Sequence, residues 1–402
     1  MNSIQQDKTC VFQKFVAVTS TRNGVVYKTQ VKDMGCINFV TVSGALVSRD
    51  MRVVFSGSQN AKEFCLPASC EVIEKSAFEM MRGRGISTVV CPEGLRSICD
   101  NAFFCCESLK KIVFRYGSRL EHIGKQAFSQ TSIREFVAPA SLQKIDRNAF
   151  YLCRQLKRVS LNDALEEIGQ KCFASTSIAD IHIPSRISEL PTDAFLGCNN
   201  LETVTFAENS NLRRVGTEAF AKSGLKTFEA PPQLEEIGQA AFFGCKKLSQ
   251  IQLNDCLTVI GAGDIPYNML DGMSVFGETA LKCVLFPASL RRIEQYAFLG
   301  LSSLRTVEFK EGVEVFGRGC FSNTGLEKVT LPKSLTDISE KAFEGCKNLW
   351  SLEIPSEGML RTIGMRAFAD TALTKFNAPD GLQCLKREAF AGARQLRTVT
   401  LN

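Results

Sequence analysis

Cysteine and histidine are the residue types in this chain that could support metal binding or nucleophilic catalysis. The 402 residues include 17 Cys but only 2 His. The two histidines, His122 and His182, lie far apart in the chain and share no short motif with a Cys or Ser. A histidine that binds zinc or activates a nucleophile works together with residues of these types. We therefore expect neither histidine to be catalytic or to bind a metal.

The cysteines recur at equivalent places, which favours a structural role. Cys172 and Cys320 stand immediately before a Phe of a repeated phrase, and Cys65 and Cys70 lack zinc-finger spacing. Five more cysteines follow such a Phe by three residues: Cys106, Cys153, Cys198, Cys245 and Cys346. A small, buried, apolar residue shows this recurrence. The sequence predicts core cysteines, and it predicts neither a metal nor a cofactor.

Nucleotide and nucleic-acid motifs are also missing. The segment 261–266 begins like a dinucleotide loop, but Pro266 stands where the third Gly is required. The formal charge of +6 is spread along the chain, and the nearest approach to a basic block, residues 82–85, is interpreted as a turn. We predict that the chain is not an enzyme and binds no nucleic acid. The alternative of another class is the binding region of a longer enzyme or regulator.

One phrase, Ile-x-x-x-Ala-Phe followed by a Leu and alternating apolar residues, organises most of the chain. Its Phe, called the anchor Phe below, occurs fourteen times: Phe78, Phe103, Phe128, Phe150, Phe173, Phe195, Phe220, Phe242, Phe276, Phe298, Phe321, Phe343, Phe368 and Phe390. Successive anchors lie 22 to 25 residues apart, except for one step of 34. A fixed period of this size indicates a solenoid.

Two kinds of repeat alternate. The strand-opening Leu or Ile follows the anchor by six residues in the longer kind and by five in the shorter. In the longer repeat of Phe103 we expect a short strand at 109–114, with Ile112 and Phe114 pointing inward and Lys111 outward. A return run, such as 142–145, and then a turn with a short helix complete each repeat. Stacked copies would share one continuous core.

The phrase Leu335-Thr336-Asp337-Ile338-Ser339-Glu340-Lys341-Ala342-Phe343-Glu344-Gly345-Cys346 and its sister copies resemble the BspA-like leucine-rich-repeat proteins. This resemblance covers about residues 63 to 402. It implies an α/β repeat solenoid, a right-handed superhelix with a parallel sheet on the concave face and short helices or turns on the convex side. It also implies recognition or adhesion at a surface, and it implies no catalytic residues.

The expected organisation has two parts. Residues 1–62 would form a β-rich cap, in which 39–62 resemble an irregular hairpin repeat of the same family. Residues 63–402 would form the array, which carries an insertion at 261–275. The chain stops on a strand at 396–402 without a polar cap, so we expect either a longer product or a partner that covers this end.

Outward strand positions and the insertion are the candidate surface for a protein partner. The strand positions are polar, mixed in charge and nearly free of aromatic residues, so a solvated surface without a partner is the alternative. The candidate residues are Glu135, Arg158, Asp180, His182, Thr203, Thr205, Glu229, Gln250, Gln252, Glu308, Lys328, Glu353, Tyr267, Met269 and Leu270.

The features of the sequence that bear on cellular location disagree. The first residues are polar, no apolar run approaches the ~18 residues of a membrane helix, and no Asn-X-Ser/Thr acceptor occurs. These observations predict a cytoplasmic interaction scaffold. The family resemblance instead implies a surface antigen or adhesin that recognises a host or matrix protein.

Overall fold

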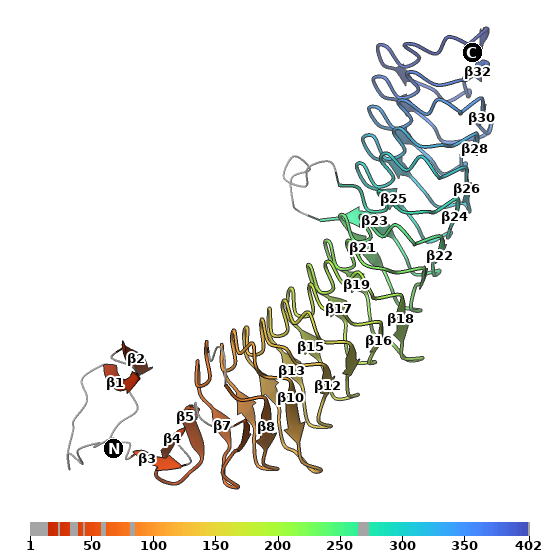
Figure 1. The fold of residues 1–402 in the computed structure, drawn as a ribbon. Helices are drawn as coiled ribbons and strands as arrows, with labels where there is room; N and C mark the ends of the chain where they lie inside the picture. Colours follow the sequence, from red (N-terminus) through yellow and green to blue (C-terminus); the bar gives the residue numbers. More distant parts are fainter. Residues whose placement is uncertain are drawn as a thin grey trace.

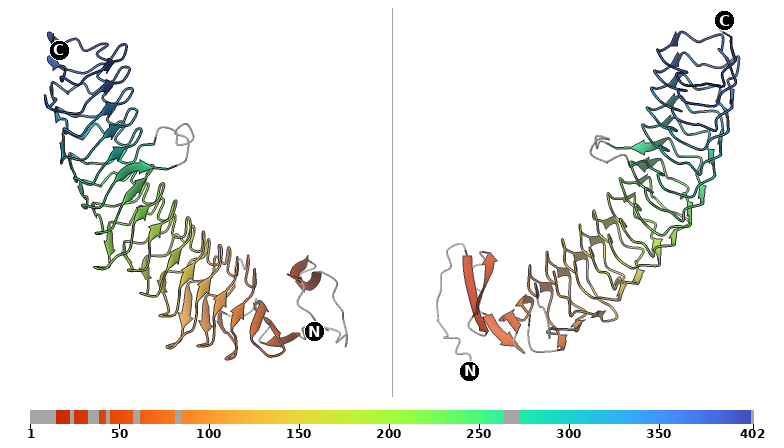
Figure 2. Two further views of the ribbon diagram at one scale, coloured as in Figure 1. Left: turned by 180° about the vertical axis from the view of Figure 1, so that it is seen from behind. Right: turned by 45° about the horizontal axis from the view of Figure 1, so that its top comes forward.

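The computed structural model describes residues 15–22, 25–32, 39–42, 45–57, 62–80, 85–263 and 273–400. The repeats stack into a long, curved solenoid, with successive turns of the chain lying one above the next (Figure 1). Each turn contributes a longer strand, a two-to-four-residue strand on the return run, and a compact turn around the anchor Phe. Figure 2 shows from two further directions that the stack continues on both sides of residues 264–272.

The N-terminal segment contains antiparallel strands. β1 (Phe15–Arg22) pairs with β2 (Val25–Lys32), and β3 (Phe39–Val42) pairs with β4 (Ala45–Ser48). β4 then pairs with β5 (Val53–Ser56), which continues into the parallel ladder of the array.

The longer strands lie along one side of the solenoid, which we call the strand face. They are β6 (Glu63–Cys65), β8 (Thr88–Cys91), β10 (Lys111–Phe114), β12 (Glu135–Val137), β14 (Arg158–Ser160), β16 (Asp180–Ile183), β18 (Thr203–Phe206), β20 (Thr227–Glu229), β22 (Gln250–Gln252), β24 (Cys283–Phe286), β26 (Thr306–Phe309), β28 (Lys328–Thr330), β30 (Ser351–Glu353), β32 (Lys375–Asn377) and β34 (Thr398–Thr400). Wherever they pair with one another, they pair in parallel. The predicted inward and outward positions are confirmed in β10, where Ile112 is buried, Phe114 packs on the core and Lys111 is exposed.

The return runs form a second parallel ladder, which the sequence analysis did not predict. Its strands are β7 (Val72–Ile73), β9 (Ser97–Ile98), β11 (His122–Ile123), β13 (Lys144–Ile145), β15 (Glu167–Ile168), β17 (Glu189–Leu190), β19 (Arg214–Val215), β21 (Glu236–Gly238), β23 (Val259–Ala262), β25 (Arg292–Ile293), β27 (Val315–Phe316), β29 (Asp337–Ile338), β31 (Thr362–Ile363) and β33 (Cys384–Leu385). In β7 to β31 the second residue carries the apolar side chain that enters the core, as at Ile123 and Val215, whereas Leu385 of β33 is exposed. We call this side the return-run face.

The expected short helices are wrong, because no helix occurs among the described residues. The segment around each anchor Phe is a series of tight turns, as in the repeat of Phe103. Asn101 and Cys105, two residues to either side of that anchor, have φ of 57° and 56°. An α-helix excludes such left-handed residues, whereas a type II turn requires one.

Backbone hydrogen bonds show why this arrangement is preferred to a helix. The amide of Ala102 donates within its own turn to Cys99, while the amide of Phe103 donates to Ala127 in the next turn at 2.7 Å. Alternate amides around the anchors therefore bond within the turn and across to the neighbour. The third side of the solenoid is hydrogen-bonded from turn to turn almost as a sheet is, and this pairs buried backbone groups without a helix.

The anchor side chains form an unbroken column through the core. Each of the fourteen rings stacks on the next, with centroids 4.7 to 5.7 Å apart and planes within 20° of parallel. The stack crosses the 34-residue step intact, since Phe242 and Phe276 lie 5.5 Å apart at 5°. The insertion therefore leaves the core unchanged.

The recurrent cysteines form a second buried column beside the anchors. Cys198 has no exposed surface, its thiol donates to the carbonyl of Phe173 at 3.0 Å, and its sulfur lies 3.2 Å from the hydroxyl of Thr176. Cys153, Cys245 and Cys346 make the same two contacts in their own turns. The alternation of longer and shorter repeats thus pairs a Cys with a Thr or Ser. The prediction of core cysteines is confirmed for the recurrent positions and is wrong for Cys65, which is exposed.

Burial should make these thiols unreactive. It raises the pKa of Cys198 and of Cys346 to about 11, so at pH 8 the thiolate is about one thousandth of the thiol. Maleimide added to the native chain should label the exposed Cys65, Cys256 and Cys283 within minutes and label Cys198 and Cys346 only after denaturation. Mass spectrometry of the peptides measures this, and rapid native labelling of Cys198 would contradict the buried column.

Candidate binding face

The outward side chains of the strand face form two parallel columns. The register aligns Asp180 with Thr203 and His182 with Thr205 on β16 and β18, and Thr227 with Gln250 on β20 and β22. All twelve predicted residues of the strand face are exposed: Glu135, Arg158, Asp180, His182, Thr203, Thr205, Glu229, Gln250, Gln252, Glu308, Lys328 and Glu353. Their positions are as expected, and their role in binding stays a prediction.

Some of these side chains have partners on the same face. Arg158 and Glu135 form an ion pair at 3.1 Å, which is the single ion pair between outward strand-face side chains in the described part of the chain. His182 Nδ1 lies 2.9 Å from the hydroxyl of Thr205, and the hydroxyl of Thr330 donates to Glu353 at 2.9 Å. Within the same described ranges, the carboxylates of Asp180 and Glu229 form no ion pair. Between β16 and β22 the outward side chains therefore have few partners among themselves.

The return-run face differs, because its charges are paired between turns. Arg96 bonds Glu121 at 2.9 Å and Lys144 bonds Glu167 at 2.8 Å. The same pattern recurs for Arg213 with Glu235 and for Arg291 with Glu314. Ladders of this kind neutralise their own charge and leave fewer free groups for a partner.

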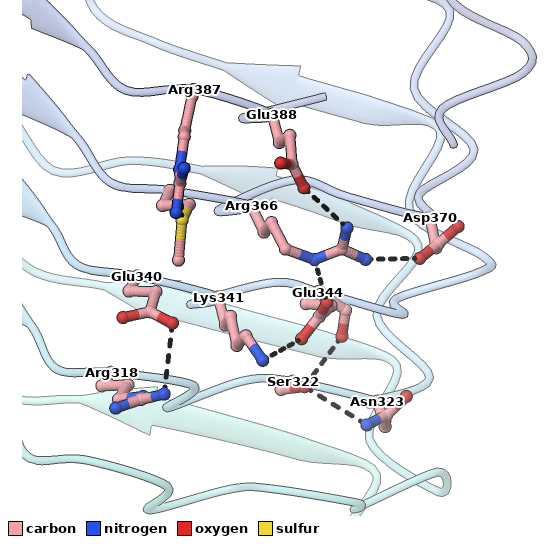
Figure 3. Close-up of polar contacts among 11 residues, drawn as sticks. Arg318, Ser322, Asn323, Glu340, Lys341, Glu344, Arg366, Asp370, Arg387 and Glu388 are labelled. Carbon is pink, nitrogen blue, oxygen red and sulfur yellow. Dashed lines mark hydrogen bonds and ion pairs between the residues drawn. The ribbon is translucent and has the colours of Figure 1, made fainter. Parts of the chain in front are cut away.

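The side that carries the anchor turns is also internally paired near the C-terminal end. Figure 3 shows Arg366 at the centre of a cluster that spans three neighbouring turns. Its guanidinium donates to Glu344 at 2.6 Å, to Glu388 at 3.1 Å and to Asp370 at 3.2 Å. These carboxylates raise the pKa of Arg366 further above its usual value, with Glu344 as the largest cause. Such groups hold the turns together, so the strand face is the better candidate for binding.

The aromatic residue on the strand face was missed by the sequence analysis. Trp350, the single Trp of the chain, directly precedes β30 and is 45% exposed, with the ammonium of Lys328 4.5 Å from its ring centroid. Exposed Trp is common among residues that dominate protein interfaces. The sequence did carry a signal for this residue, because the one Trp stands at the start of a strand, where other repeats mostly have a polar residue.

The remaining candidate residues do not come together in a catalytic or metal-binding site within the described ranges. Tyr267, Met269 and Leu270 lie outside the described residues, as do residues 82–84 of the basic turn. His122 lies in β11 with its Nε2 3.5 Å from an oxygen of Asp146. Across the ranges that the structure describes, no group of three His, Cys, Asp or Glu side chains could hold a metal, and no helix could cross a membrane.

Comparisons with known proteins agree with this architecture. The family model described as the BspA type leucine rich repeat region matches in six copies, over residues 51–163, 121–249, 207–264 and 272–397. No curated protein sequence matches the chain.

One solved structure shares the fold at low sequence identity, and others align with lower scores. A leucine-rich repeat protein from Bacteroides ovatus aligns with a TM-score of 0.74 and 23% identity, over 98% of this chain and 100% of that one. A second, from Eubacterium ventriosum, aligns over 89% and 93% of the two chains at 20% identity and a TM-score of 0.46. The pneumococcal vaccine antigen PcpA aligns over 96% and 94% at 19% identity and a TM-score of 0.39.

Proposed function

Because the chain belongs to the BspA-type leucine-rich-repeat family, we propose that it is a non-enzymatic solenoid that binds a protein partner through its strand face. The observation that carries the proposal is the contrast between the two ladders. Charges on the return-run face are paired between turns, while the outward side chains within β16 to β22 have few partners among themselves. Solenoids offer such extended surfaces to other macromolecules.

Matched substitutions test this proposal. The strand-face variant carries Thr203→Ala, Thr227→Ala and Gln250→Ala, and the control carries Gln143→Ala, Ser188→Ala and Gln383→Ala from the return-run side. All six positions are exposed and neither variant changes the net charge. A protein captured from the producing cells by the intact chain should lose at least about tenfold in affinity for the first variant, equivalent to about 1.4 kcal/mol.

The control variant should keep the affinity of the unmodified chain within about twofold, a difference of ~0.4 kcal/mol. Equal losses for the two variants would mean that the strand face does not govern capture. A loss of affinity confined to the control variant would show that the strand face is not the binding face.

The insertion is the second part of the proposed surface. Replacing residues 261–275 with the four residues that separate Ile from the anchor Phe in an ordinary repeat, as at 238–241, removes Tyr267, Met269 and Leu270 while keeping the flanking turns. If the insertion contacts the partner, affinity falls while the melting temperature stays unchanged. Unchanged affinity would restrict the binding site to the strands.

The location that we propose is the cell surface, because the family resemblance implies a surface antigen or adhesin. A cytoplasmic scaffold would bind through the same face. Protease added to intact cells separates the two, since a surface protein is cleaved and a cytoplasmic one is left whole until the cells are lysed.

A further inference from the structure

A pocket of about 380 Å³ opens beside the strand face, where the chain leaves the anchor turns and enters β18, β20 and β22. Its lining residues are Asn199, Lys222, Ser223, Gly224, Gly244, Lys246, Lys247 and Glu278. The lining thus contains three lysines and one carboxylate.

Two glycines, Gly224 and Gly244, belong to the lining. A Cβ on Gly224 would lie 2.3 Å from the carbonyl oxygen of Asn199, so a side chain cannot be added there without moving the backbone. Gly244 has a φ of +72°, in the left-handed region that favours glycine. The backbone therefore keeps both positions of the lining free of larger side chains.

The charges around it leave one more ammonium group than carboxylates. Lys246 reaches Glu278 only at 3.6 Å, and Lys247 shares Glu202 with Lys226. Hydrogen bonds from Lys226 and Lys247, Lys226 first, lower the pKa of Glu202 to about 2. Lys222 forms no ion pair within the ranges that the structure describes, and its charge acts on the carboxylate of Glu218. Taken with Glu202, Glu218 and Lys226, the group has four ammonium groups and three carboxylates.

The position is also distinct among the repeats. In each longer repeat, the two residues that follow the recurrent Cys position face the start of the next strand. Only one of these pairs, Lys246-Lys247, is dibasic; its counterparts include Asn199-Asn200 and Ser302-Ser303. These two lysines lie four and three residues before Gln250, the first residue of β22.

We propose that this lysine pocket receives acidic side chains of the protein partner that lies on the strand face between β16 and β22. The inference rests on the proposed function and adds the chemistry of the partner: an acidic polypeptide segment whose carboxylates form charge-assisted hydrogen bonds with Lys222, Lys246 and Lys247. Long-range attraction to the lysines would also speed association at low salt.

The test uses a fluorescent deca-glutamate peptide as the probe and the whole chain at low ionic strength. The variant Lys222→Gln/Lys246→Gln/Lys247→Gln should weaken peptide binding at least tenfold. The control Lys110→Gln/Lys157→Gln/Lys347→Gln, which removes three exposed lysines elsewhere, should change it less than twofold. Unaltered circular dichroism and melting of both variants confirm that they fold, and Lys222→Gln alone provides a smaller change in the same direction.

Three results would overturn the inference: no peptide binding, equal loss in variant and control, or displacement of the peptide by inorganic phosphate at equal charge concentration. Tighter, lysine-dependent binding of a sulfated oligosaccharide of equal charge would assign the pocket to a glycan instead. Failure here leaves the strand-face variants unaffected, because Thr203, Thr227 and Gln250 lie outside the pocket lining. The two proposals can therefore fail separately.

Discussion

Replacing Phe220 with alanine is expected to lower the free energy of unfolding by about 3–5 kcal/mol, the cost of a large core cavity. The ring has no exposed surface and stacks between Phe195 and Phe242 at 5.4 and 5.7 Å. Phe228 of β20 also packs against it at 6.1 Å. The substitution thus removes partners on three sides.

The solenoid architecture also predicts where along the chain stability is lost. In a solenoid each repeat touches only its neighbours, so a weak turn divides the array into separately unfolding parts. Urea denaturation followed by circular dichroism should show a second transition, and amide exchange should rise first around residues 218–222. The half-buried Phe104, outside the anchor stack, is the control, and Phe104→Ala should cost less than half as much. Equal costs would contradict the role of the stack.

Adding one methyl group at Gly169 should destabilise the array by about 1–3 kcal/mol, the usual cost of overpacking. A Cβ there would lie 2.3 Å from the backbone nitrogen of Arg147 and 2.5 Å from the carbonyl carbon of Asp146. Both atoms belong to the backbone of the preceding turn, so no side-chain rotation relieves the clash. The turns must separate locally, which lengthens the hydrogen bonds between them.

Gly94 supplies the matched control for this substitution. Its nearest neighbour to an added Cβ is a carbonyl oxygen at 3.8 Å, and its φ lies outside the left-handed region. Gly94→Ala should therefore stabilise the chain by about 0.4–1 kcal/mol by restricting the unfolded state. Thermal unfolding measures both variants. Changes of the same sign would show that turn spacing does not set the effect.

The periodic apolar pattern was enough to predict the repeat, the anchor Phe and the inward residues of the strands. A single turn would expose its apolar side chains to solvent. Residues such as Leu109, Ile112 and Phe114 can therefore form a core only when turns stack on one another. The helices were predicted wrongly because the six residues of Ile-Gly-x-x-Ala-Phe are long enough for between one and two helical turns. The contrary signal was the Gly two residues after several anchors, such as Gly197 and Gly345, where φ is +70° and +73°.

The second ladder and the binding candidates depend on contacts between turns. Lys144 and Glu167 are 23 residues apart, and their ion pair follows only from the register of β13 with β15. The same holds for the lysine pocket, since Lys222 and Lys246 belong to consecutive repeats. Outward positions could be predicted from alternation, whereas the pairing of their charges could not.

Site-specific photocross-linking tests most directly whether the strand face is the binding face. A photoreactive amino acid is placed at Thr205 or Gln252 on the strand face, and at Gln143 or Ser188 on the return-run side, all four positions being exposed. With the captured protein partner added, we predict cross-links to it from Thr205 and Gln252 and none from the other two positions. Cross-links from Gln143 and Ser188 without any from Thr205 and Gln252 would contradict the proposal.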